Sequence, residues 1–162
     1  MRNRVWGSIC NFVFKAYVMD AMVMRYQKYD KRINICLAIV SSSSIAAWTV
    51  WQIVPQLWAG IIAITQVIQA IKPYFPYSKY IRALNEKSKQ LHDINRRLDR
   101  LFFNIDYAHL NTEEIADQYF KLKAEAENVC FFGDDMNFVP KKNDIEYANQ
   151  ETATYLRNNY TV

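Results

Sequence analysis

The chain has few residues that break helices and none of the common catalytic motifs. Its 162 residues include only three Gly and four Pro, so tight turns have few places to form and a mostly helical structure is expected. Three Cys are an odd number without a CxxC spacing, which argues against a disulfide framework and a zinc site. There is no P-loop, GxSxG, HExxH or Gly-rich nucleotide loop. The sequence therefore predicts a non-enzymatic protein without a metal or cofactor.

Charge is also missing from one long stretch, residues 33–71. Residues 1–32 hold seven Lys or Arg and two acids, and residues 72–110 hold eight and four. Residues 111–162 reverse the balance, with five basic and ten acidic residues. A run of 39 uncharged residues in a chain with 22% charged residues is typical of a membrane segment.

The length of this run predicts two membrane spans. Residues 33–54 would form a helix of about 33 Å, which matches a hydrocarbon core of about 30 Å. Pro55 suits the first position of a new helix, and residues 55–71 would add a second span of about 26 Å. Basic residues flank both outer ends and are absent from the turn, so both termini are expected in the cytoplasm. Trp residues near the turn, with Tyr and Phe at the opposite boundary, agree with two interfacial belts.

The expected fold class is an all-α membrane protein with a two-helix transmembrane hairpin. A cytoplasmic amphipathic N-terminal helix is expected in residues 1–32, a long cytoplasmic helical region in 72–130, and a loop with a C-terminal helix in 131–162. The N-terminal helix could lie in the membrane interface or pack on the helix that follows the hairpin, and the pattern does not separate the two. The alternative fold is a hairpin buried inside a soluble helical bundle.

The two predicted spans carry polar side chains, which are costly in hydrocarbon unless they are paired or face water. One interpretation is that they bridge the two spans or neighbouring subunits. The other is that they line an aqueous pathway formed by several hairpins, because two helices cannot enclose a pore alone. The candidates for pore lining or hairpin contacts are Ser41, Ser44, Gln52, Thr65, Gln66 and Gln69.

A heptad pattern follows the hairpin, with coiled-coil-like spacing from about residue 78 to residue 109. Leu84, Leu91 and Leu98 recur every seven residues, and Asn95 occupies a companion position, where a polar residue fixes register or subunit number at a cost in stability. These four residues are the predicted oligomer seam. The remaining face is basic and is interpreted either as a solvated face near anionic lipid headgroups or as a docking surface for an anionic signal, such as a nucleotide or a nucleic acid. Its candidate regulatory residues are Arg96, Arg97 and Arg100.

The order of these features resembles a known family. The segment RYQKYDKRIN precedes a Ser-rich first span, and a short Trp/Pro turn, a second span and a long charged helix follow. This pattern is similar to the SLATT family, two-transmembrane effectors found beside nucleotide-signalling enzymes in prokaryotic anti-phage systems. The resemblance covers about residues 15–130 and rests on the architecture and on the run from Arg25 to Ser44.

The resemblance implies an oligomeric effector of bacterial antiviral defence in the inner membrane. Such an effector forms a pore or disrupts the membrane once a partner or signal activates it, and growth arrest or cell death follows. The implied partners are the lipid bilayer, further copies of the chain, and an operon-encoded nucleotide-signalling enzyme or reverse transcriptase. The alternative function is a membrane anchor or scaffold that recruits a partner through its cytoplasmic coiled coil.

Overall fold

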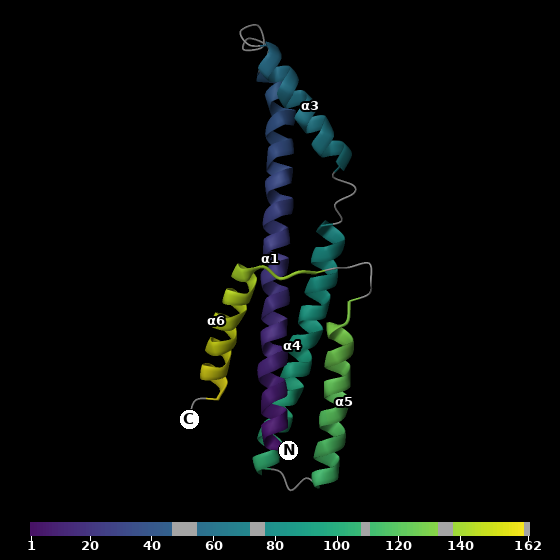
Figure 1. Ribbon diagram of the computed structural model, residues 1–162, viewed down its shortest axis with the longest axis vertical. Helices are drawn as coiled ribbons and strands as arrows, with labels where there is room; N and C mark the ends of the chain where they lie inside the picture. The colour runs from purple at the N-terminus through teal and green to yellow at the C-terminus, as the bar shows by residue number, and fades with distance from the viewer. Residues whose placement is uncertain (47–54, 72–76, 108–110, 133–137, 161–162) are drawn as a thin grey trace. The chain divides into compact units, whose positions relative to one another are not determined.

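A computed structural model describes residues 1–46, 55–71, 77–107, 111–132 and 138–160. Within these ranges helices are the only regular secondary structure and there is no strand, which confirms the predicted helical class. The helices are α1 (Arg2–Ala46), α3 (Pro55–Ile71), α4 (Tyr77–Tyr107), α5 (Thr112–Cys130) and α6 (Lys142–Asn159) (Figure 1).

Proline stands at or next to two of these helix starts in the sequence. No Pro precedes Pro55, and α1 is a continuous helix of 45 residues. α3 begins at Pro55 itself, because a missing N–H costs nothing in the first turn of a helix, and it ends at Ile71. In the sequence, Pro76 immediately precedes Tyr77, where α4 begins.

The membrane-spanning hairpin expected from the sequence is wrong for the described part of the chain. No helix there is both long enough and apolar enough to cross a bilayer. The uncharged part of α1 that is described runs only from Ile33 to Ala46, 14 residues or about 21 Å. α3 has 17 residues, about 26 Å, which is less than a hydrocarbon core of about 30 Å. Residues 47–54, which complete the predicted first span, lie outside the described residues.

The helices fall into two compact units. Unit 1 consists of Met1–Met24 and Arg82–Val162, and unit 2 consists of Arg25–Ile81. In unit 1 the first half of α1 runs beside α4, and α5 and α6 pack with them (Figure 1). Its core comes from apolar residues spaced three or four apart, which share one helix face. These include Val5, Ile9, Phe12, Val13 and Ala16 of α1, Leu84, Leu91 and Leu98 of α4, Ile115, Tyr119, Leu122 and Ala126 of α5, and Ala148 of α6.

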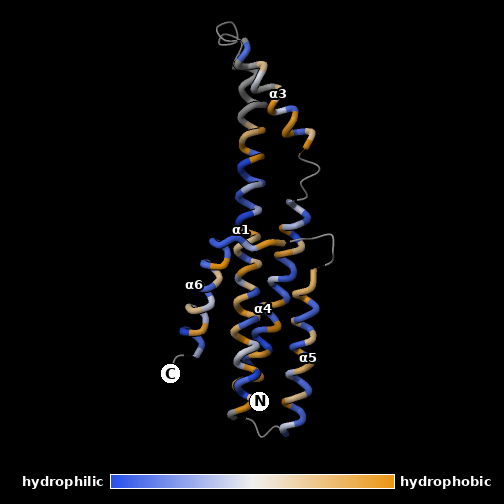
Figure 2. The backbone as a smooth tube through the Cα atoms, viewed as in Figure 1, coloured by the Kyte–Doolittle hydropathy of each residue, from blue (hydrophilic) through white to orange (hydrophobic). Residues whose placement is uncertain are grey.

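Unit 2 contains the second half of α1, helix α3 and the first turn of α4. The ring of Tyr26 lies 6.0 Å from the rings of both Tyr77 and Tyr80, measured between centroids. Apolar residues dominate α3 (Figure 2). Several of them remain exposed to solvent: Ile64 by 62%, Val67 by 55% and Ile71 by 42%.

Candidate functional site

The functional candidates of unit 1 centre on a polar row along α4. Ser88, His92, Asn95 and Asp99 follow one another at spacings of four, three and four residues, so they lie on one face of the helix. Ser88 and Asn95 are 1% and 2% exposed, although both are polar. The row runs between the buried leucines of the same helix. It therefore brings hydrogen-bonding groups into a core that is otherwise apolar.

The first part of the row meets α1 at Asp20. The Ser88 hydroxyl donates to one carboxylate oxygen of Asp20, and Nε2 of His92 lies 2.9 Å from the other oxygen. The edge of the Tyr17 ring packs on the His92 ring, with centroids 5.3 Å apart. Ser88 and His92 thus share the carboxylate of Asp20 as their partner. The cluster joins two helices.

The far end of the row meets α6 at Asp99. The hydroxyls of Tyr155 and Tyr160 both donate to the Asp99 carboxylate. Burial raises the pKa of each tyrosine, and the hydrogen bond to Asp99 and its negative charge raise it further. Tyr160 also packs edge-on against Trp6 of α1, with ring centroids 4.8 Å apart. Asp99 therefore fixes the last turns of α6 to α4.

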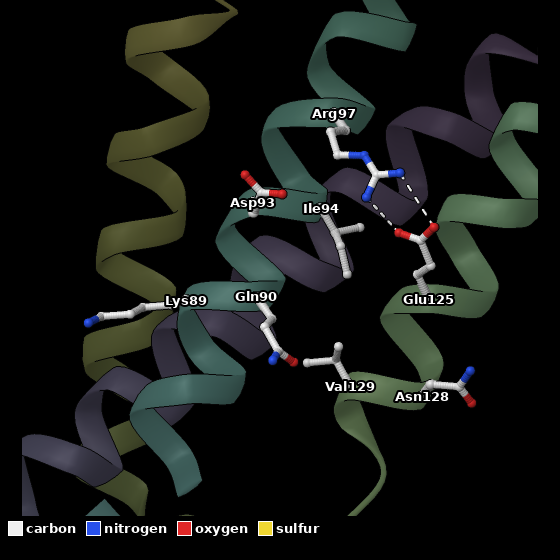
Figure 3. A pocket seen from close by; sticks show the side chains of 8 residues that line it. All are labelled: Lys89, Gln90, Asp93, Ile94, Arg97, Glu125, Asn128 and Val129. Carbon is white, nitrogen blue, oxygen red and sulfur yellow. Dashed lines mark hydrogen bonds and ion pairs between the residues drawn. The ribbon is translucent and has the colours of Figure 1, made fainter. Parts of the chain in front are cut away.

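A groove lies on the other side of α4, against α5 (Figure 3). Two hydrogen bonds, 2.6 Å and 3.4 Å long, join the Arg97 guanidinium to the Glu125 carboxylate across it. Both side chains are partly exposed, 46% and 36%, and such pairs contribute only about 0–1 kcal/mol. At the end of α5, Nζ of Lys87 donates to the carbonyl oxygens of Val129 and Phe131 at 2.9 Å and 2.7 Å. This cation satisfies carbonyl groups that a helix end leaves without partners.

The predicted basic face is only partly available for an anion. Arg96 pairs with Asp93 one turn earlier on α4, at 2.9 Å, and Arg97 pairs with Glu125 of α5. Arg100 is exposed. Acidic neighbours thus offset two of the three predicted regulatory cations.

The predicted oligomer seam is buried inside unit 1. Leu84, Leu91 and Leu98 are 0% exposed, and Asn95 is 2% exposed. The Ser88 hydroxyl, on the same face, lies 3.5 Å from the carbonyl oxygen of Ala16, so α1 of the same chain packs against this face. Subunit association through the seam stays a prediction. The burial shows that these side chains pack within one chain.

The polar residues predicted for the spans are divided between the two halves of the predicted hairpin. Gln52 and the side chains of Ser41 and Ser44 lie outside the described part of the structure. On α3, Thr65 is 7% exposed, whereas Gln66 and Gln69 are exposed. The two glutamines thus stand on the surface beside the exposed apolar residues of the same helix.

Two contacts of the polar row had no counterpart in the sequence predictions. Asp20 interrupts the apolar stripe of the N-terminal helix, which is the one signal that could have marked it as a buried partner. The contacts of Asp99 with Tyr155 and Tyr160 join residues 56 and 61 positions apart. No short-range pattern records such pairings.

Among the described residues, no group of three His, Cys, Asp or Glu side chains could hold a metal ion. Comparison of the chain with protein-family models, with curated proteins and with solved structures finds no match.

Proposed function

We propose that this chain is a non-catalytic helical effector that works by associating with further copies of itself through α3. The observation that supports the proposal is the exposed apolar surface of this helix, formed by Ile64, Val67 and Ile71. Contiguous exposed apolar residues are typical of interaction sites, because their burial against a partner removes them from water.

The composition of α3 favours a second copy of the chain as the partner. The helix carries no charged residue over its 17 positions, so a charged partner surface would lose its hydration without gaining an ion pair. α3 of another copy offers an equally uncharged surface. The exposed amides of Gln66 and Gln69 each donate and accept hydrogen bonds, so they can pair with the same groups across a two-fold axis.

The biological part of the proposal comes from the family resemblance. In antiviral defence, association would follow activation by a partner or signal, and growth arrest would follow association. The pore and the inner-membrane location depend on the hairpin described above and are not part of this proposal. The scaffold alternative needs an accessible coiled-coil face on α4, and that face is buried in unit 1.

The proposal is tested by replacing two exposed apolar residues of α3 together, Ile64→Ser and Val67→Ser. Burying each of these side chains contributes about 1.5–3 kcal/mol, so the loss of both should weaken association at least about a hundredfold. Light scattering after size-exclusion chromatography measures the mass of the full chain. The control is Phe120→Ser on α5, which removes an apolar side chain that is 52% exposed and should leave the mass unchanged.

A wild-type chain that stays monomeric across the concentration range contradicts the proposal, and so does a double variant that keeps the wild-type mass. The effector role is measured separately, as growth of a bacterial culture that expresses the chain with its partner genes. Growth arrest that persists in a monomeric double variant would show that the effector role does not depend on association through α3.

A further inference from the structure

An apolar cavity of about 340 Å³ lies in unit 1 between α1, the start of α4 and the segments that follow α5 and open α6. This volume falls within the range of small-molecule sites, about 300–1,000 Å³. Ten of the eleven described residues that line it have apolar side chains or a thiol, and the eleventh is Lys15. A ligand that fills the cavity is therefore largely apolar, because polar groups would lose their hydrogen bonds to water there. The apolar lining includes Phe14, Met19, Met22, Leu84, Phe132 and Ile145.

The wall that follows α5 is held in place by its own contacts. The rings of Phe132 and Phe138 pack edge-on, with centroids 4.7 Å apart. Nζ of Lys87 lies 4.9 Å from the centroid of the Phe132 ring, and the same nitrogen donates to the carbonyl oxygens of Val129 and Phe131. The cavity thus has a wall that is fixed without a ligand, as is usual for small-molecule sites.

The rest of the lining suits an alkyl chain with a negative end. Met19 and Met22 of α1 are unbranched side chains, which adapt to ligands of different shape. Burial raises the pKa of the Cys130 thiol, so the thiol is neutral at pH 7 and belongs to the apolar wall. The positive charge of Lys15 lowers the same pKa, which shows that this charge acts on a group in the cavity wall.

The charge of Lys15 is available to a ligand. Lys15 makes no ion pair with any described residue. Two carboxylates in the surrounding segments have partners of their own. Glu127 pairs with a lysine of its own helix at 3.8 Å, and Asp144 accepts a hydrogen bond from the backbone nitrogen of Lys141 at 2.8 Å. An ammonium group has three N–H donors, and those of Lys15 can meet an anion.

We propose that this cavity binds the alkyl chain of a fatty acid anion, whose carboxylate meets Lys15. The affinity comes from the methylene groups, because each one that leaves water for the apolar lining favours binding. The charged hydrogen bond between ammonium and carboxylate fixes the end of the chain.

The site is distinct from the association surface of the proposed function, because its residues belong to unit 1 and α3 belongs to unit 2. The Ile64→Ser, Val67→Ser double variant is therefore expected to bind fatty acids as the wild type does. Weaker binding in that variant would place the alkyl chain on α3 and contradict the proposal. Self-association and fatty acid binding are thus tested independently.

Isothermal titration calorimetry of the full chain with hexanoate, octanoate and decanoate, each below its micelle concentration, tests the proposal. Each probe has two methylene groups more than the one before. Each added pair should tighten binding about fifteenfold as long as the cavity has room. Octanol has the chain without the charge and should bind more weakly than octanoate.

Two substitutions test the two ends of the ligand. Lys15→Met removes the charge and keeps an unbranched side chain, so it should weaken octanoate binding about threefold or more and leave octanol binding unchanged. Its control, Lys121→Met, removes an exposed cation of α5 outside the cavity. Val18→Trp enlarges a side chain of the lining and should weaken octanoate and octanol alike, at least about tenfold. Its control, Ala124→Trp, adds the same ring at an exposed position of α5.

Three results would overturn the proposal. The first is no binding of decanoate at millimolar concentration. The second is an equal affinity for the three fatty acids, which would indicate attraction to a basic surface only. The third is an unchanged octanoate affinity in Lys15→Met or in a folded Val18→Trp variant. Circular dichroism shows whether Val18→Trp folds, and if it does not, Lys15→Met and the chain-length series decide.

Discussion

The unpartnered amide of Asn95 leads to a prediction about stability whose sign is opposite to that of most core substitutions. We expect Asn95→Leu to make the protein more stable. Substitutions in a packed core destabilise in the majority of cases. Here, however, the wild-type side chain buries two polar atoms that make no hydrogen bond, and Leu would remove both of them.

The size of the gain follows from three terms, two of which favour Leu and one of which opposes it. Each buried polar group without a partner costs about 1–3 kcal/mol, and a buried Leu side chain contributes about 1.5–3 kcal/mol. Leu is larger than Asn, and overpacking a dense core costs about 1–3 kcal/mol. We therefore expect a net gain of about 1–3 kcal/mol in the free energy of unfolding.

Urea unfolding followed by circular dichroism measures this free energy, and an increased midpoint with an unchanged slope reports a change in stability. The control is Ser88→Leu, a polar-to-Leu change at another buried position of the same helix face. The Ser88 hydroxyl donates to Asp20, so its loss leaves a carboxylate oxygen without that partner, and we expect this variant to be destabilised. A destabilised Asn95→Leu variant would refute the reasoning, because it would show that the amide is satisfied in solution.

Two further predictions concern the packing of the same helices. Leu91→Ala should destabilise the protein by about 2–5 kcal/mol in urea unfolding, because Leu91 is 0% exposed. The control, Phe131→Ala, changes a residue that is 72% exposed and should alter the free energy of unfolding little. Equal effects of the two substitutions would contradict the assigned core. Burial and the Asp99 carboxylate raise the pKa of Tyr155 and Tyr160 above the usual 10.0. The contribution of these two tyrosines to the free energy of unfolding is therefore complete below about pH 10 and declines as the pH rises further. The free energy of unfolding should therefore fall from about pH 8 to about pH 11, and it should fall less in the Tyr155→Phe, Tyr160→Phe double variant. Parallel pH profiles for the wild type and the double variant would show that these tyrosines do not cause the decline.

The helices themselves were largely predictable from local rules. The start of α3 follows from Pro55, because proline favours the first turn of a helix. Its end, Ile71, coincides with the end of the uncharged run. The membrane prediction came from the same run, and it assumed that absence of charge means contact with lipid. Hydropathy reports which residues avoid water but not what covers them, and the described helices are too short or too charged to span a bilayer.

The heptad pattern of α4 likewise indicates which helix face is buried but not what covers it. The spacing of Leu84, Leu91 and Leu98 indicated a buried stripe, and all three are buried. The pattern did not identify the partner, since α1 of the same chain and a second copy of α4 would both satisfy a stripe of that period. The contacts of Asp99 with Tyr155 and Tyr160 were not predictable at all, because residues so far apart in sequence share no local periodicity.

Asn95 illustrates why a broken local rule is informative. A helix face that serves only to pack against α1 and α6 is best filled by apolar residues, and three leucines occupy it nearby. An amide without partners lowers stability at such a position, and departures from local packing rules are expected at functional sites. Urea unfolding of Asn95→Leu tests this reasoning. A gain in stability would show that the unpartnered amide lowers the free energy of unfolding, whereas a loss would show that the amide finds a partner in solution.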